Sequence, residues 1–157
     1  MIEVFDRPTL EAEGFTGFVK FSDLAASTAP DVPGVYVVIR VGGGDPAFRA
    51  ASSGGWFKGR DPSVPIDVLT GRWTPDCPVL YIGKATSLRK RLRQYARFGA
   101  GKPVGHWGGR YIWQLEESAD LLVAWKSTSD DPREVEQCLL ATFIERHGCM
   151  PFANLTL

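Results

Sequence analysis

The 157-residue sequence has no long hydrophobic run, no clustered cysteines and no formal net charge. No apolar segment approaches the roughly 18 residues that a membrane-spanning helix needs, so we expect no membrane partner. The acidic start, residues 1–14, lacks the apolar core of a secretory signal peptide. We therefore expect a cytoplasmic protein. A chain of 157 residues is typical of one domain with its own core, which predicts a single domain over 1–157.

The scarcity of cysteine and histidine limits the metals that the chain could bind. Cys77, Cys138 and Cys149 are odd in number and far apart, and they match neither a zinc-site nor a disulfide spacing. This pattern predicts reduced thiols. His106 and His147 are too few for a histidine-rich metal site. A catalytic metal would therefore be held mainly by carboxylates, which favours Mg²⁺ or Mn²⁺.

The charges are balanced in number but segregated along the chain. Lys and Arg together number 18, as do Asp and Glu. This balance argues against tight, non-specific binding of nucleic acid by the whole surface. However, five of the ten positions 84–93 are basic, whereas acidic residues gather in 115–120 and 129–136. The segregation predicts a local basic face.

Hydrophobic patterns and turn residues predict an α+β fold. Runs rich in β-branched and aromatic residues predict three strands, at 33–40, 78–85 and 119–128. Capping patterns predict two longer helices and a short one, at 87–99, 131–148 and 108–118. We expect a small three-stranded, mostly antiparallel sheet flanked by helices.

Two segments lie outside this core pattern. Residues 1–32 form an N-terminal extension, and residues 41–77 form a long inserted loop between the first two strands. A loop of this length in a compact domain is usually functional or mobile. Lys58 and Arg60 belong either to a surface loop or to a flap over a substrate, and the sequence leaves both readings open.

The basic helix predicted at 87–99 has one arginine placed differently from the others. An apolar stripe, made of Leu88, Leu92 and Tyr95, marks its buried face, and Arg91 lies at the border of that stripe. Other basic residues point into solvent: Arg89, Lys90, Arg93 and Arg97. Arg91 can therefore lean over the sheet, where its planar fork suits a phosphate group.

The last predicted helix places a carboxylate on its apolar face. Glu136 falls near the middle of an arc formed by Leu139, Leu140, Phe143 and Ile144. An unpaired carboxylate on a packed face is costly, so a cation must stabilise it. Both a structural salt bridge and a metal ion satisfy this requirement.

Five sequence elements occur in an order that is typical of one nuclease family. They are "GVY" at 34–36, "YIG" at 81–83, Arg91 ten positions after Tyr81, "EQCLL" at 136–140 and "PFAN" at 151–154. Together they resemble the GIY-YIG nuclease superfamily. The segment "YIGKATSLRKRLRQY" is similar to the N-terminal nuclease domain of UvrC-type excision-repair proteins. The resemblance covers about residues 33–157. The chain departs from the family in its long gap between the strand motifs and in Leu140, where isoleucine is commoner.

The resemblance implies a metal-dependent endonuclease that hydrolyses nucleic-acid phosphodiester bonds, with DNA favoured over RNA. It implies catalytic roles for Tyr36, Tyr81, Arg91, Glu136 and Asn154. Glu136 would hold Mg²⁺ or Mn²⁺, and Asn154 would steady the site near the metal. Either tyrosine could be the base; we favour Tyr36 as the base and Tyr81 as the group that orients water or phosphate. We expect substrate contacts from Lys84, Arg89, Tyr95, His106 and Arg110.

Two other readings compete with the enzyme. One is a non-catalytic nucleic-acid-binding module that kept the fold; the presence of all five family residues disfavours it. The other is a protein-interaction scaffold, which predicts no basic patch across the sheet. No second DNA-reading domain is evident, so specificity would depend on the 41–77 loop, a homodimer or a partner protein.

Overall fold

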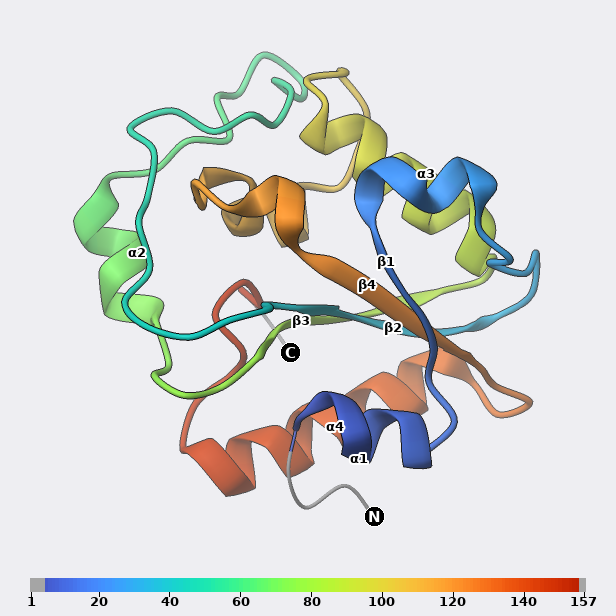
Figure 1. Ribbon diagram of the computed structural model, residues 1–157. Helices are drawn as coiled ribbons and strands as arrows, with labels where there is room; N and C mark the ends of the chain where they lie inside the picture. The colour runs from blue at the N-terminus through green and yellow to red at the C-terminus, as the bar shows by residue number, and fades with distance from the viewer. Residues whose placement is uncertain (1–4, 156–157) are drawn as a thin grey trace.

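The computed structural model describes residues 5–155 and builds them around one antiparallel sheet (Figure 1). The strands are β1 (Thr16–Lys20), β2 (Gly34–Ile39), β3 (Val79–Ala85) and β4 (Leu122–Ser127). They are arranged in the order β1-β4-β2-β3, with every neighbouring pair antiparallel. The predicted α+β class is confirmed, with a sheet of four strands in place of the expected three.

The additional strand, β1, lies in the segment expected to be an N-terminal extension. Its backbone is irregular, because Gly17 and Phe18 both have positive φ and its register against β4 shifts between Gly17 and Val19. None of its five residues is buried. An irregular, exposed edge strand lacks the alternating pattern by which strands are recognised in a sequence.

Strand β2 forms the centre of the core. All six of its residues are buried, and it pairs with β3 on one side and β4 on the other. Successive side chains point to opposite faces of the sheet. Tyr36 and Val38 therefore join one hydrophobic cluster, and Val35 and Val37 join another.

Helices cover both faces of the sheet (Figure 1). One face packs against α1 (Arg7–Ala12) and α4 (Pro132–His147), as the cluster containing Leu10, Leu140 and Phe143 shows. The other face carries α2 (Ile66–Arg72), α3 (Leu88–Gly99) and three 3₁₀ segments, η1 (Phe21–Ala26), η2 (Trp107–Gln114) and η3 (Ser118–Asp120). In residues 5–155, no helix is long and apolar enough to cross a membrane.

The predicted starts of the two longer helices, and the predicted end of α4, are confirmed by their caps. Ser87 Oγ accepts a hydrogen bond of 3.2 Å from the Lys90 amide at the start of α3. Asp131 Oδ1 accepts one of 3.0 Å from the Arg133 amide at the start of α4. Gly148 ends α4 in the left-handed conformation, at φ 77.

Two predicted boundaries need correction. The 41–77 segment is not loop throughout, because it contains α2, whose Leu69 is fully buried in the core. The single short helix expected at 108–118 is two 3₁₀ segments, η2 and η3. Turn residues dominate both regions of the sequence and conceal their short helical pieces.

Candidate active site

Two tyrosines from neighbouring strands meet on the face of the sheet that α3 covers. Tyr36 on β2 and Tyr81 on β3 have ring centroids 6.0 Å apart. Tyr36 lies opposite Gly83 in the strand register. A Cβ atom at Gly83 would overlap the ring of Tyr36, so the glycine of "YIG" provides the space that the first tyrosine occupies.

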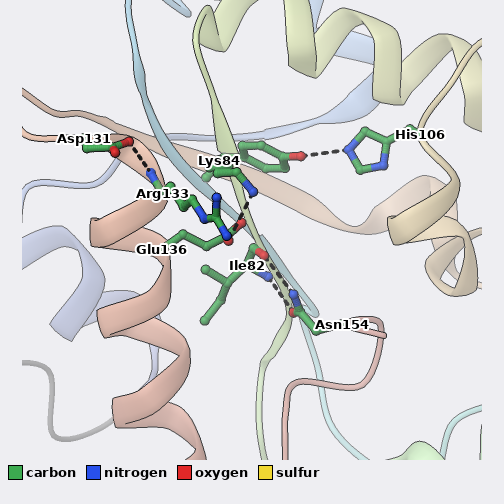
Figure 2. A network of polar contacts seen from close by, with 8 residues as sticks. Ile82, Lys84, His106, Asp131, Arg133, Glu136 and Asn154 are labelled. Carbon is green, nitrogen blue, oxygen red and sulfur yellow. Dashed lines mark hydrogen bonds and ion pairs between the residues drawn. The ribbon is translucent and has the colours of Figure 1, made fainter. Parts of the chain in front are cut away.

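A buried histidine completes this aromatic cluster. Tyr36 Oη and His106 Nε2 form a buried hydrogen bond of 2.7 Å (Figure 2). The His106 ring stacks on Tyr95 with centroids 3.4 Å apart and an interplanar angle of 4°. Tyr95 is itself fixed, because its hydroxyl donates to the Gly109 carbonyl oxygen at 2.6 Å. Tyr36 and His106 therefore form a positioned pair.

Burial keeps this pair uncharged. Burial, reinforced by Tyr81, raises the pKa of Tyr36 well above 10, and the nearby Arg91 charge does not offset this. The pKa of Tyr81 is raised to about 12, again mainly by burial. Burial and then Arg91 lower the pKa of His106 well below 6.5. At neutral pH, a protonated phenol therefore faces a neutral imidazole.

Arg91 joins this buried cluster to a cationic cleft. It is half-buried, and its Nη1 donates to the Gly105 carbonyl oxygen at 3.1 Å and to Gln94 Oε1 at 3.0 Å. Its charge acts on the ionisation of both tyrosines and of His106. The adjoining cleft has a volume of ≈ 460 Å³, and its charged lining residues are Lys84, Lys90, Arg91, Asp131 and Arg133. Four cations and one carboxylate line the cleft, which suits an anionic ligand.

Glu136 on α4 is the ion-pair partner of Lys84, one of the residues that line the cleft. Only 12% of its side chain is exposed, and its Oε1 is 3.5 Å from Lys84 Nζ (Figure 2). Burial raises the pKa of Glu136 despite the opposing charges of Lys84 and Arg133. The charge of Glu136 also acts on Tyr36 and Tyr81. The ion pair with Lys84 therefore does not compensate fully for burying this carboxylate.

The donor set restricts how a metal could bind here. Within residues 5–155, no group of three or more His, Cys, Asp or Glu side chains is arranged to hold a metal ion. A protein-only cage is therefore not built around Glu136. Mg²⁺ is commonly held by one or two carboxylates together with water and substrate phosphates. Glu136 fits that arrangement as the one carboxylate, and water or a bound phosphate would supply the remaining oxygen ligands.

Asn154 has a backbone partner on β3. Its Oδ1 accepts from the Ile82 amide and its Nδ2 donates to the Ile82 carbonyl oxygen, both at 2.9 Å (Figure 2). Ile82 directly follows Tyr81. Asn154 therefore fixes the segment that carries the second tyrosine, and both ends of its amide are used in doing so.

The residues expected to contact substrate differ in solvent exposure: some are exposed and others are buried. Lys84 lines the cleft, and its side chain is 47% exposed. Arg89 is exposed and donates to the Ala29 carbonyl oxygen at 3.0 Å. Tyr95 and His106 are buried, so both act within the protein interior. Arg110 packs its guanidinium over the Trp107 ring at 4.5 Å.

Two residues of the cleft have no site assignment from the sequence patterns, and a third residue, His106, has a partner that those patterns do not predict. The helical wheel predicts that Lys90 points into solvent, and Arg133 lies in an acidic run, yet both line the cleft. The contact of His106 with Tyr36 joins residues 70 positions apart. The sole sequence signal for that contact is the glycine-rich setting of His106, "VGHWGG", which lets the backbone approach closely.

Comparison with known proteins gives no match. No protein-family model matches the chain, and neither a curated protein nor a solved structure matches it.

Proposed function

We propose that the protein is a divalent-metal-dependent endonuclease of the GIY-YIG type that hydrolyses phosphodiester bonds, with DNA favoured over RNA. The observation that carries the proposal is that Arg91, whose charge acts on the adjacent Tyr36 and Tyr81, lines one cleft with Lys84, the ion-pair partner of Glu136. This agrees with the sequence resemblance, which implies catalytic roles for Arg91, Glu136 and the two tyrosines.

The cationic cleft supports a nucleic-acid substrate. Lys84, Lys90 and Arg133 line it together with Arg91, and such a cluster fits a phosphodiester backbone. Arg91 stabilises the charge that develops on the non-bridging oxygens, because its planar fork donates two parallel hydrogen bonds. The basic lining disfavours a protein-interaction scaffold without nucleic-acid affinity.

Tyr36 relays a proton rather than acting as a preformed phenolate. Its raised pKa keeps it protonated, and it donates its hydrogen bond to the neutral His106 Nε2. When water attacks phosphorus, its proton passes to the Tyr36 oxygen as the tyrosine proton passes to His106. Tyr81 lies beside Tyr36, is the less buried of the two and orients the water. The leaving oxygen takes a proton from solvent in the cleft.

A divalent cation bound at Glu136 would supply Lewis-acid stabilisation of the phosphate and leaving oxygen. Glu136 would hold that cation together with the substrate. In the free protein, Lys84 provides the compensating positive charge at 3.5 Å.

The decisive experiment compares Glu136→Gln with the wild-type protein. The substrates are supercoiled plasmid, linear duplex, branched DNA and RNA, each with Mg²⁺, Mn²⁺ or a chelator. We expect Glu136→Gln to lose metal-dependent cleavage and to keep nucleic-acid binding. Its melting temperature should equal or exceed that of wild type, because a costly buried carboxylate is removed.

Glu134→Gln is a matched control, because Glu134 lies on the same helix and is exposed. Cleavage by Glu134→Gln should match wild type. Retained cleavage and lower stability in Glu136→Gln would instead make Glu136 half of a structural ion pair. Binding without cleavage by the wild-type protein would favour the non-catalytic nucleic-acid-binding module.

A further inference from the structure

The segment between β2 and β3 contains a defined turn near its middle. Phe57 and Arg60 exchange two backbone hydrogen bonds, of 3.1 and 3.0 Å. The two residues between them, Lys58 and Gly59, have φ values of 53 and 74. Positive φ at both central positions is the geometry of a type I′ turn, which fixes the direction of the chain.

This turn is attached to the wall of the candidate active site. The Gly55 amide donates to the Phe98 carbonyl oxygen at 2.9 Å, which ties the turn to the end of α3. The Phe57 ring lies 3.3 Å from where a Cβ atom on Gly105 would be. Gly105 is also the residue whose carbonyl oxygen accepts from Arg91. The turn is therefore a fixed neighbour of the site.

Two arginines from separate segments meet at one indole ring. The guanidinium carbon of Arg60 lies 4.9 Å from the Trp107 ring centroid, and that of Arg110 lies 4.5 Å from it. Arg110 Nη1 also donates to the Trp107 carbonyl oxygen at 3.1 Å. The indole stacking holds both guanidinium groups in place.

No acidic side chain balances these charges. Within residues 5–155, Lys58, Arg60 and Arg110 form no ion pair. Arg110 Nε is buried without a hydrogen-bond partner. Burial, followed by the charge of Arg60, lowers the pKa of Arg110. Two fixed guanidinium groups without a carboxylate form a ready site for a phosphate.

An exposed tryptophan lies immediately before the turn. Trp56 is 59% exposed and has no aromatic partner in the described part of the chain. A large exposed ring is unfavourable in water, and beside cationic residues it can stack on a nucleic-acid base. Stacking requires an unpaired base, because a duplex hides the faces of its bases.

This surface adjoins the proposed catalytic residues. His106, the partner of Tyr36, directly precedes Trp107 in the chain. A Cβ atom on Gly108 would lie 3.9 Å from the Tyr81 hydroxyl. A strand that places a phosphate beside Tyr81 could therefore continue onto the surface around Trp107.

We propose that the surface formed by Trp56, Lys58, Arg60, Trp107 and Arg110, here called the insertion-loop surface, binds a single-stranded segment next to the scissile phosphate. Arg60 and Arg110 hold a phosphate, and Trp56 stacks on an unpaired base. The proposal rests on the proposed function for its substrate class. Its test measures binding alone and requires no cleavage.

The test is fluorescence anisotropy in chelator at several salt concentrations. The probes are a labelled oligothymidine of about 12 nucleotides, within the usual span of single-strand sites, and a duplex of similar length. Arg60→Ala should weaken oligothymidine binding and reduce the salt slope by about 0.7, the value for one lost phosphate contact. Arg110→Ala should do the same. Trp56→Ala should weaken oligothymidine binding roughly 5- to 150-fold and leave duplex binding unchanged.

Arg146→Ala is the matched control, because it removes one exposed arginine from α4, which packs on the opposite face of the sheet. The proposal is overturned if Arg60→Ala binds oligothymidine as Arg146→Ala does, or if the wild-type protein does not bind it. An equal loss of duplex and single-strand binding in Trp56→Ala would overturn the single-strand assignment. Because Arg60 is exposed, its substitution tests the surface even if Arg110→Ala fails to fold. Absence of cleavage would contradict the nuclease proposal without affecting these binding results.

Discussion

The candidate site has a charged, solvent-facing half and a neutral, buried half. Lys84 and Lys90 are exposed and line a cleft, whereas Tyr36 and His106 are no more than 1% exposed and are held uncharged by burial. Arg91 touches both halves. In the proposed mechanism, phosphate binding would use the exposed charged half and proton transfer the buried neutral half. Water keeps the lysines charged, and its exclusion keeps the phenol and the imidazole neutral.

The strongest test of this comparison removes the side chain that joins the two halves. Arg91→Ala should lower cleavage by about 10²–10³-fold, because transition-state charge loses a donor. Arg91→Lys should restore cleavage in part, because the bidentate fork is missing. Steady-state rates on a plasmid substrate measure both effects.

Arg89 provides the control on the same helix. It is exposed and bonded to the Ala29 carbonyl oxygen, away from the cleft lining. Arg89→Ala should mainly weaken binding in a salt-dependent way and leave the turnover rate near that of wild type. If Arg89→Ala abolished turnover and Arg91→Ala did not, the two roles would be reversed.

A second test changes the buried half alone. His106→Gln should reduce cleavage by about 10²-fold, because glutamine can accept a hydrogen bond but cannot take a proton. Wild-type activity should fall as pH drops through the lowered pKa of His106 and stay level above it. His106→Gln should instead gain activity towards high pH, because Tyr36, whose pKa is raised, must then ionise by itself.

The groups that face His106 are Tyr36, Tyr81, Tyr95 and Arg91. Tyr95→Phe keeps the stacked ring and serves as a control for packing. If His106→Gln cleaved at the wild-type rate with an unchanged pH profile, His106 would be a packing residue and Tyr36 would not relay a proton.

The third test removes the Asn154 side chain, which is bonded to Ile82 on β3, the strand that carries Tyr81 and Lys84. Asn154→Ala leaves the amide and carbonyl groups of Ile82 without their present partners. The free energy of unfolding should fall by about 1–3 kcal/mol for each buried group left unpaired. Denaturant titration measures this loss. Asn154→Asp should destabilise at least as much, because it buries a carboxylate whose second oxygen faces the Ile82 carbonyl oxygen. Unchanged stability in Asn154→Ala would mean that water replaces the amide at no cost.

The smallest expected effect is a dependence of stability on acid. The unfolded chain binds the His106 proton with a pKa of about 6.5, whereas burial lowers the pKa in the folded protein. The unfolded state therefore binds more protons below about pH 6.5. Stability should decline there as pH falls, and this contribution should stay constant at higher pH. Thermal melts of wild type and His106→Gln, compared from neutral to acid pH, isolate it. Parallel curves for the two proteins would contradict it.

The regular parts of the fold could be predicted from the sequence, because their signals are local. Buried β-branched runs indicated β2 and β3, and caps indicated α3 and α4. The inward placement of Glu136 followed from helical periodicity and agrees with its burial. These features depend on residues within a few positions of one another.

The remaining features depend on contacts between distant parts of the chain. The bond between Tyr36 and His106 spans 70 positions, and Arg60 reaches Trp107 from a separate loop. β1 is irregular and exposed, so its pairing with β4 leaves no periodic signal. Arg133 was hidden in an acidic run, where composition alone gives no reason to select it.

The contact between Asn154 and Ile82 also bears on self-association of the protein. β3 is an outer strand of the sheet, and a free outer strand is a template on which another chain can add a strand. Asn154 occupies both outward groups of Ile82, and the Ala153 amide donates to the Leu80 carbonyl oxygen at 2.8 Å. Residues 153–154 thus cover the part of this edge formed by Leu80 and Ile82. A protein shortened before Pro151 would expose this edge, and its copies would self-associate through β3.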